Sequence, residues 1–407
     1  IDNVSVKEVL TANADFDFTR ASTATRINSK GLIESVASNV PRLDYSNGDC
    51  PSLLLEPQST NLIPYSEDFS NSSWSKADIT VSSDVVISPE GTLKADEIIE
   101  GVANSEHYVF KVVTIPDNTD YTISCFFKKG ISNDYVYLRG RAKSGSNVRA
   151  WFNISNGTLG TVDSGAVAKI KDFNNGWFKC SITINVLTGG SSVLALLGLA
   201  DNDNSFAYLG DGVSSSYFWG AQAEENSYPT SYIPTSGTTQ TRVAETCGGA
   251  GDASSINSEE GVLYAEISAL SNDGTSRRLA ISDGTNSNRL FLAYTSTSNE
   301  LIAVSISNNV TSVLISKSIN VLQINKIAFK YKENDFALWV NGVKLGVDTS
   351  ANTPIGINTL RLEDGNGSNP FYGNTKDLRV YNTALTDFEL LGITSPILYP
   401  SFNEMAT

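Results

Sequence analysis

NKIAFKYKENDFALWVNGVKLG, residues 325–346, carries the clearest strand pattern in the chain. Apolar side chains fall at every second position in two runs on either side of the turn 333–335, and they are Ile327, Phe329, Tyr331, Phe336, Leu338 and Val340. Asn341-Gly342 then gives a strong type I′ turn signal, because these residue types tolerate positive φ. Since side chains alternate across a strand, this stretch predicts antiparallel strands with one buried face.

The same alternation recurs along most of the chain. It is seen in YTISCFF (121–127), WFKCSITINV (177–186) and GVLYAEISAL (261–270), with turn-rich segments between them. Many Thr, Ser, Val and Tyr residues are typical of short strands, and TALTDFELLG (383–392) is the stretch that indicates a short helical turn. We therefore predict an all-β fold: two antiparallel β-sandwich (jelly-roll) domains with an N-terminal extended segment.

Composition shifts set the expected boundaries. Prolines 57 and 64 favour an extended N-terminal strap over residues 1–65, which also holds two short strands around the turn 28–31. In the segment FWGAQAEENSYPTSYIPTSGTTQTR (218–242) we expect Trp219 to lie in the core and Tyr228 and Tyr232 to hold the extended end of the segment in place. A polar stretch follows this segment. The predicted parts are 1–65, a sandwich at 66–245, a linker at 246–258, a sandwich at 259–396 and a tail at 397–407.

Charge and cysteine usage exclude several classes of protein. The formal net charge of −15 argues against nucleic acid as the main partner, because phosphate binding needs a basic surface. No apolar run approaches the roughly 18 residues of a membrane span, so no membrane insertion is expected. The four cysteines show no CxxC spacing, which excludes a zinc ribbon. Cys125 and Cys180 fall on apolar faces, where buried free thiols are favoured over a bridge between strands.

Two parts of the chain resemble known families. FTRASTATRINSKGLIE (18–34), PRLDYSNGDCPSLLLEPQSTNLIPYSEDF (41–69) and YFWGAQAEENSYPTSYIPTSGTTQTR (217–242) resemble a module of tail-fibre-like and other virion-surface proteins of bacteriophages. There the motifs frame a jelly roll similar to carbohydrate-binding modules. KIAFKYKENDFALWVNGV (326–343) and FYGNTKDLRVYNTALTDFEL (371–390) resemble a concanavalin-A/laminin-G-type jelly roll. The first resemblance spans residues 15–245. Both resemblances imply a protein of the glycan-binding class, although many relatives are purely structural.

Motifs for catalysis are missing from the sequence. One histidine, His107, cannot form an HExxH zinc site, and no GxSxG elbow, Walker loop or GxGxxG occurs. His107 lies in a strand pattern, so a structural role is expected. Paired carboxylates are the remaining route to glycan cleavage, but the E-x-D-x-x-E pattern of laminarinase-like relatives is not matched. We expect no catalytic residues and no enzyme activity.

The polar face of the first sandwich is the candidate binding surface. Ligand pockets combine aromatic side chains with a few well-placed polar groups, and LRGRAKSGSNVRAW (138–151) adds basic residues to an acidic chain. A local positive field attracts an acidic glycan. The alternative is a solubilising hairpin end whose rings are covered by the N-terminal segment or by a neighbouring subunit. The candidate glycan-binding residues are Tyr135, Tyr137, Arg139, Arg141, Trp151, Trp177 and Lys179.

A structural calcium ion is the one cofactor to consider, because jelly rolls often hold one through carboxylates and carbonyls. The loop DNDNSFAYLGDG (201–212) offers Asp201, Asp203 and Asp211, although Phe206 replaces the glycine that an EF-hand loop needs. LEDGNGSN (362–369) offers Glu363 and Asp364. A solvated turn is the alternative at both places.

These features together predict a non-catalytic adhesin at a virion surface, and hence an extracellular protein. Its expected ligand is bacterial surface polysaccharide, with a role as tail fibre or receptor-binding component. The resemblance also implies other virion proteins as partners and a homotrimer, which would strengthen weak sites through avidity. The alternatives are a structural virion protein, such as a head fibre or capsid decoration, and a polysaccharide depolymerase or lyase.

Overall fold

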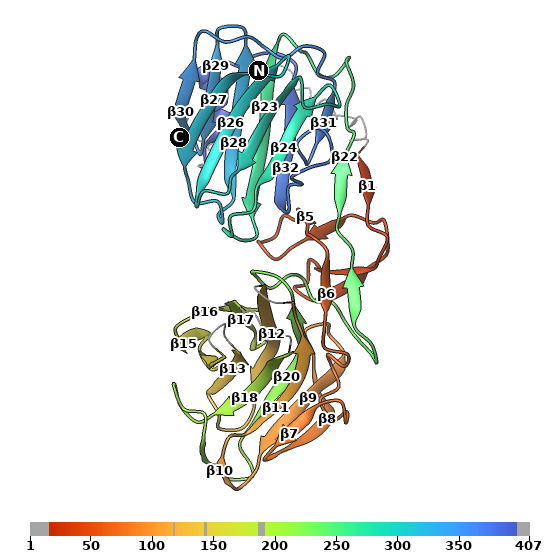
Figure 1. Cartoon of the computed structure of the whole chain (residues 1–407), viewed down its shortest axis with the longest axis vertical. Coiled ribbons are helices and arrows are strands. Elements are labelled where there is room, and N and C mark those ends of the chain that lie inside the picture. Colours follow the sequence, from red (N-terminus) through yellow and green to blue (C-terminus); the bar gives the residue numbers. More distant parts are fainter. Residues whose placement is uncertain (1–15, 117–118, 142–144, 186–191, 397–407) are drawn as a thin grey trace, which may run out of the picture. The chain divides into compact units, whose positions relative to one another are not determined.

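A computed structural model describes residues 16–116, 119–141, 145–185 and 192–396. The described chain divides into two compact units (Figure 1). The first unit comprises residues 20–51 and 56–244, and the second unit residues 16–19, 52–55 and 245–396. Antiparallel strands dominate both units, which confirms the predicted all-β fold. None of the helices in the described residues is long and apolar enough to cross a membrane.

The first unit is a sandwich of two antiparallel sheets. The sheet that we call sheet A runs in the order β15 (Thr158–Val162), β14 (Asn147–Asn153), β13 (Tyr135–Arg141), β18 (Ser192–Ala200), β11 (Tyr108–Thr114) and β7 (Ser75–Ala77). Sheet B runs in the order β16 (Ala166–Asp172), β17 (Trp177–Asn185), β12 (Asp120–Lys129), β20 (Ser215–Glu224), β9 (Leu93–Glu100) and β8 (Ile79–Ile87). A short ladder joins β10 (Asn104–Ser105) to β19 (Tyr208–Leu209).

The inner faces of sheets A and B form the main core of the first unit. The inward residues expected from alternation are buried there, namely Tyr121, Ile123, Cys125, Phe127, Val136, Leu138, Phe178, Cys180, Ile182 and Ile184. Val186, also expected to point inward, lies outside the described residues. Cys125 and Cys180 stand opposite each other on β12 and β17, and both are free thiols, as is the exposed Cys50. The prediction of buried free thiols at Cys125 and Cys180 is confirmed, and Cys247 is also a buried free thiol.

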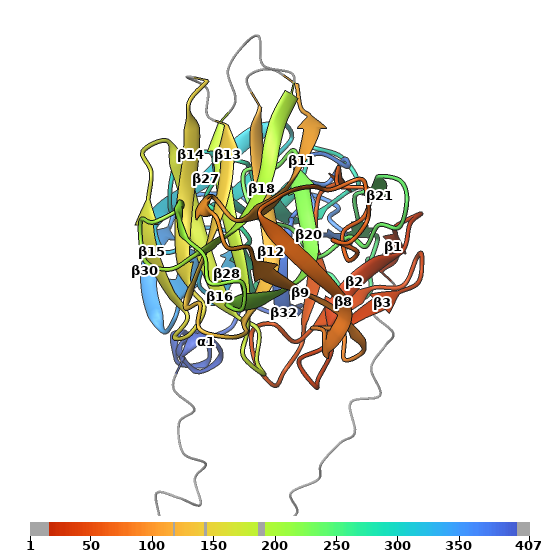
Figure 2. The same ribbon diagram turned by 90° about the horizontal axis from the view of Figure 1, so that it is seen from below.

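The strap before the sandwich is made of short strands. β2 (Ala24–Ile27) and β3 (Ile33–Val36) form the expected hairpin around Gly31, and β4 (Arg42–Asp44) follows. β6 (Ser59–Asn61) pairs with β21 (Gln240–Arg242), so the two ends of the unit close on each other. Figure 2 shows β2 and β3 beside β8 and β9. Ile33 of this hairpin packs in a second cluster with Phe126, Trp177, Trp219 and Tyr232 on the outer face of sheet B.

The second unit is also a sandwich. One sheet contains β30 (Val343–Asp348), β29 (Phe336–Val340), β28 (Asn325–Lys332), β23 (Glu260–Ala269), β32 (Gly373–Tyr381) and β5 (Ser52–Leu55), in that order. The other, sheet C, contains β27 (Val310–Ser318), β26 (Glu300–Ser307), β25 (Arg289–Tyr294), β24 (Arg277–Ser282) and β31 (Thr359–Arg361). β1 (Asp17–Thr19) pairs with β22 (Thr246–Gly248) beside them.

The stretch 325–346 folds as its pattern predicts. Its six alternating apolar residues all lie in the core between the two sheets. Asn341 and Gly342 have φ values of 49° and 82°, as a type I′ turn requires. The expected helical turn is α1 (Asp387–Thr394), which begins with a capping box between Thr386 and Glu389.

The units divide the chain differently from the sequence-based boundaries. The expected strap 1–65 is shared: its residues 20–51 and 56–65 belong to the first unit, and β5 belongs to the second. The expected linker 246–258 contributes Cys247, Ala250 and Ile256 to the core of the second unit. Local composition misses both features, because the residues that pair with or pack on these two segments lie far away in sequence.

Candidate functional site

The seven residues expected to bind a glycan lie on two different sheets. Five of them come from β13 and β14 of sheet A, and Trp177 and Lys179 come from β17 of sheet B. The outer face of sheet A carries its own apolar cluster, separate from the main core. We call this surface the aromatic face; it comprises Tyr108, Phe110, Tyr135, Tyr137, Arg139, Arg149, Trp151, Leu196 and Phe206.

Cross-strand pairing orders the aromatic face into two rows. The first row runs from Tyr108 through Gly198 and Tyr137 to Trp151, so three aromatic residues cross four strands. Gly198 is required in this row, because a Cβ atom there would overlap the ring of Tyr137. The rings of Tyr137 and Trp151 stack with centroids 6.0 Å apart. Because all members of a row share one side of the sheet, these three rings lie on the outer face of sheet A.

The second row adds positive charge. It runs from Phe110 through Leu196 and Arg139 to Arg149. Arg139 donates to Glu106 at 2.6 Å and lies over the Tyr108 ring at 5.3 Å. Arg149 lies 3.9 Å from the centroid of Phe206, and its Nε is buried without a hydrogen-bond partner among the described residues. Arg149 is only half-buried as a residue, so its guanidinium group adds positive charge beside the Phe206 ring.

Four of the seven candidate glycan-binding residues are buried, so their expected exposure was wrong, and three of the four lie on sheet A. Tyr137 and Arg139 are covered because Glu106 accepts hydrogen bonds from both side chains, and burial raises the pKa of Tyr137. Trp151 is covered by the loop after β18, since its indole donates to the Ser205 carbonyl at 2.6 Å. Neither large ring presents a free face to a sugar.

Other rings of the same face remain half-exposed. They are Tyr108, Phe110, Tyr135 and Phe206, and of these Tyr135 alone was expected. Tyr108 and Phe110 alternate with the buried Val109, which is the sequence signal that could have identified them. Arg141 is exposed at the end of β13, and its Nε donates to the Gly145 carbonyl at 3.0 Å. The half-exposed rings and Arg149 are therefore the accessible part of the aromatic face.

Trp177 lies under the strap and Lys179 lies against the segment 218–242, which corrects their expected exposure. The indole of Trp177 is buried against Ile33 and donates to the Ile87 carbonyl at 3.0 Å. Lys179 donates to the Thr230 carbonyl at 2.8 Å, and burial lowers its pKa. The alternative, in which the N-terminal segment covers rings, is confirmed for Trp177. A cavity of about 170 Å³ beside it is lined by Leu32, Lys128, Phe173, Asn174 and Asn175.

The three aspartates of the expected calcium loop are not gathered. Asp203 accepts from the amide and hydroxyl of Thr161, and Asp211 accepts from the amides of Val213 and Ser214. In the described part of the chain, no group of three or more His, Cys, Asp or Glu side chains could hold a metal ion. The loop instead folds over sheet A, with Asp203 fastening it to β15.

Glu363 and Asp364 are buried, which overturns the picture of a solvated turn. The Glu363 carboxylate accepts from the amides of Gly365 and Gly367 and lies 3.3 Å from Arg361. Asp364 accepts from the Ser368 amide and the Asn369 side chain. These carboxylates thus organise their own loop.

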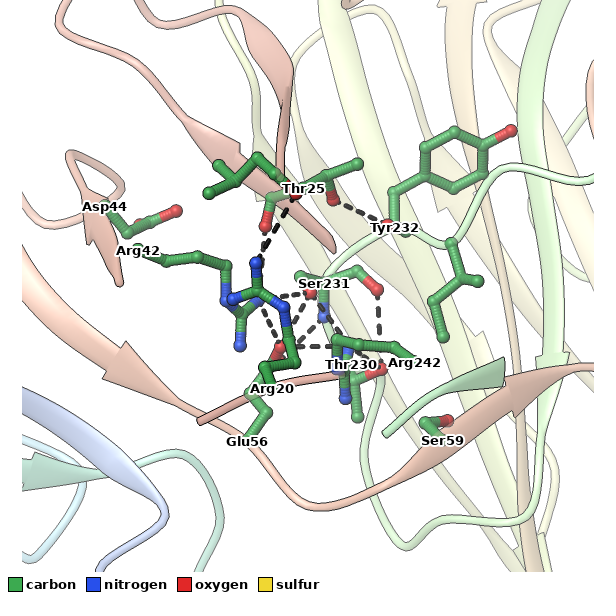
Figure 3. Close-up of polar contacts among 12 residues, drawn as sticks. Arg20, Thr25, Arg42, Asp44, Glu56, Ser59, Thr230, Ser231, Tyr232 and Arg242 are labelled. Carbon is green, nitrogen blue, oxygen red and sulfur yellow. Dashed lines mark hydrogen bonds and ion pairs between the residues drawn. The ribbon is translucent and has the colours of Figure 1, made fainter. Parts of the chain in front are cut away.

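A buried charged cluster joins the strap to the end of the first unit (Figure 3). We call it the Glu56 clasp, formed by Arg42, Glu56, Ser231 and Arg242. Glu56 Oε2 lies 2.8 Å from Arg42 and 3.0 Å from Arg242, and it accepts from the Ser231 hydroxyl at 2.6 Å. Burial raises the pKa of Glu56, but the two guanidinium groups and the Ser231 hydroxyl outweigh it and lower the pKa to about 2. The clasp is a structural device, because its charges are enclosed.

Tyr232 and Trp219 complete this attachment as expected. Trp219 is fully buried and packs on Tyr232 with centroids 4.6 Å apart. The Tyr232 hydroxyl bonds to Ser66 and Glu67, and its main-chain carbonyl accepts from Thr25 of the hairpin. The segment 218–242 therefore closes the sandwich and holds the strap over it.

His107 is a satisfied structural residue, as predicted. It is buried, with Nδ1 3.0 Å from the Asp78 carboxylate and Nε2 3.3 Å from the Tyr208 carbonyl. Its ring packs on Tyr208 with centroids 4.7 Å apart. Both nitrogens are thus engaged in holding β10 and β19 against β7 and β8.

Comparison with solved structures finds matches at low identity. The carbohydrate-binding module CBM40 of the Ruminococcus gnavus IT-sialidase is 18% identical, with a TM-score of 0.31 over 36% of this chain and 94% of its own. Domain 4 of AbnA, an arabinanase from Geobacillus stearothermophilus in complex with arabinotriose, is 14% identical, with a TM-score of 0.32 over 42% and 84%. Domains LG4-5 of the mouse laminin alpha1 chain are 11% identical, with a TM-score of 0.24 over 71% and 91%.

A family model describes the second unit directly. No curated protein matches the chain. Residues 254–390 match the model of the Concanavalin A-like lectin/glucanases superfamily, Laminin_G_3. The match runs from just before β23 to α1 and thus covers both sheets apart from β5. Over residues 254–390 the second unit is therefore similar to concanavalin A-like domains of the laminin G type.

Proposed function

We propose that this chain is a non-catalytic glycan-binding protein and that the aromatic face of the first unit holds a sugar. The observation that carries the proposal is the set of half-exposed rings on the outer face of sheet A, Tyr108 and Phe110 of β11 and Tyr135 of β13, on strands that a sheet holds rigidly. Rings of this kind supply flat apolar contact for the C–H face of a sugar, and neighbouring donors fix its orientation. The half-buried Arg149 lies beside these rings, over Phe206, where its guanidinium group would donate to a sugar. The similarity of the second unit to concanavalin A-like domains supports the general class, a glycan-binding protein.

The finer proposal is an adhesin of a virion surface, such as a tail fibre or receptor-binding component, with bacterial surface polysaccharide as its ligand. The resemblance of residues 15–245 to virion-surface modules supports it. A trimer would multiply a weak sugar contact through avidity. Such a protein would be extracellular and would attach to other virion proteins. Light scattering of the purified chain tests the trimer.

A glycan array followed by a reducing-end assay tests the proposed function. Retention without release of reducing ends is the expected result. Release of reducing ends would indicate a depolymerase, and no retention would indicate a structural virion protein. For any retained glycan, Tyr108→Ala and Phe110→Ala should each weaken binding at least tenfold, since a buried ring contact contributes about 1.5–3 kcal/mol.

The matched control removes an exposed ring from elsewhere. Phe388 of α1 is 84% exposed and belongs to the second unit, so Phe388→Ala should leave retention unchanged. Equal loss in Phe388→Ala and Tyr108→Ala would show nonspecific adsorption and contradict the assignment to the aromatic face. Thermal unfolding of each variant separates loss of binding from loss of fold.

A further inference from the structure

The outer face of sheet C in the second unit carries an arginine cluster that the function above does not use. Leu279, Ile281, Leu290 and Leu292 point into the core, so their neighbours on β24 and β25 point outward. Ala280 and Phe291 are directly opposite on this outer face, and Ala280 is also opposite Arg361 of β31. Because paired residues share a side of the sheet, Arg361 belongs to the same face.

Two further arginines cover the ring at its centre. The guanidinium carbons of Arg278 and Arg289 each lie 5.0 Å from the centroid of Phe291. These contacts explain why Phe291 is only 4% exposed although it points away from the core. Arginine over an aromatic face is a favourable and oriented contact. The ring therefore fixes where the two charges lie.

The acids beside the cluster do not saturate it. Asp364 lies 3.7 Å from Arg278 and 3.8 Å from Arg289, and Glu363 lies 3.3 Å from Arg361. Both carboxylates also accept hydrogen bonds from their own loop. Three guanidinium groups thus face two carboxylates, and the surplus is positive in a chain of net charge −15.

Hydrogen-bond donors of the cluster are left over. The Nε atoms of Arg278, Arg289 and Arg361 are buried and have no partner among the described residues. Arg278 makes an ion pair but no side-chain hydrogen bond in the described part of the chain. The side chains of Arg278 and Arg361 are 25% and 35% exposed, whereas those of Asp364 and Glu363 are 4% and 10% exposed. An anion arriving from solvent therefore meets the side chains of Arg278 and Arg361 before it meets the carboxylates.

We propose that Arg278 and Arg361, beside Phe291, bind the carboxylate or sulfate group of an acidic glycan. The planar guanidinium fork matches both groups in a bidentate manner, and strands hold it rigidly. The site lies on the second unit and is independent of the aromatic face. The choice of a glycan as the carrier of the anion rests on the proposed function.

Calorimetric titration with matched ligands tests the site on the full chain. The probes are an oligogalacturonate, its methyl ester and a sulfated galactan oligosaccharide, each at low salt and at about 0.15 M ionic strength. We expect at least one charged oligosaccharide to bind more tightly than the neutral ester, with affinity that falls as salt rises. Arg278→Gln and Arg361→Gln should each reduce that affinity about tenfold, because hydrogen bonds to charged groups are strong.

The control is Arg379→Gln. Arg379 lies on the other sheet of the same unit, 5.6 Å over the Tyr264 ring and paired with Asp377, so this variant makes the same change in net charge. Charged binding that survives in Arg278→Gln, or that falls equally in Arg379→Gln, overturns the proposal, as does the absence of any charge-dependent binding. Loss of neutral-glycan retention in Tyr108→Ala with intact charged binding would concern the aromatic face alone.

Discussion

Removal of the charge at the centre of the Glu56 clasp should destabilise the first unit strongly. The side chains of Glu56, Arg42 and Arg242 are 4%, 0% and 1% exposed, so Glu56→Gln leaves two buried guanidinium groups without their carboxylate. Breaking a buried ion pair by removing one partner costs about 3–5 kcal/mol. For a unit of this size each kcal/mol lowers Tm by roughly 2–4 °C, so we expect a fall of about 6–20 °C.

Differential scanning calorimetry measures this change, with Glu34→Gln as the matched control. Glu34 pairs with Arg26 at 2.6 Å in the strap hairpin, but the two side chains are 36% and 29% exposed. A surface pair of this kind contributes about 0–1 kcal/mol, so the control should unfold within a few degrees of the parent protein. If Glu56→Gln unfolds at the same temperature as Glu34→Gln, the clasp does not hold the strap and the reasoning is refuted.

Four further outcomes follow from the structure. The pKa of Glu56 is lowered from 4.5 to about 2, so its contribution to the free energy of unfolding is present above pH 4.5 and is lost as pH falls toward 2. Tm measured across that range should therefore fall less steeply in Glu56→Gln than in the parent protein. Burial raises the pKa of Asp96 to about 6, so its ionised carboxylate destabilises the folded protein at neutral pH. As pH falls from 6 to 4 this group becomes protonated and its effect on Tm is a rise, which calorimetry should not detect in an Asp96→Asn variant. An exposed-thiol titration should modify Cys50 alone in the native chain and all four thiols in denaturant, since the other three are buried. Gly198→Ala should lower stability by about 1–3 kcal/mol in thermal melts, because the new methyl group overlaps the Tyr137 ring.

Period-two alternation predicts the inner faces of both sandwiches well, because it depends only on neighbours two positions away. Cys125, Phe329 and Leu338 all lie where the pattern places them. The pattern also places Trp151 and Trp177 correctly on outward sides of their strands. Alternation contains no information about which residues pack over the outer faces of the sheets. It therefore predicts the face on which a side chain lies but not its solvent exposure.

The covering groups come from distant parts of the chain. Trp151 is covered by Ser205, which is 54 residues away in sequence. Glu56 accepts a hydrogen bond from the amide of Ser231, which is 175 residues away in sequence. Tyr108 could have been found from its alternation with Val109. The arginine cluster could not, because Arg278, Arg289 and Arg361 are united only by the pairing of three strands.

The path of the chain between its two units limits how the molecule can be taken apart. Residues 52–55 form β5, which pairs with β32 and buries Leu55 in the core of the second unit, although the sequence on both sides belongs to the first. A fragment that begins at Glu245 would lack this strand, and a fragment that ends at Ala244 would carry it without its neighbour. Neither unit can therefore be produced with its fold complete by a single cleavage of the chain. Isolation of the second unit requires a circularly permuted gene or an added β5 peptide.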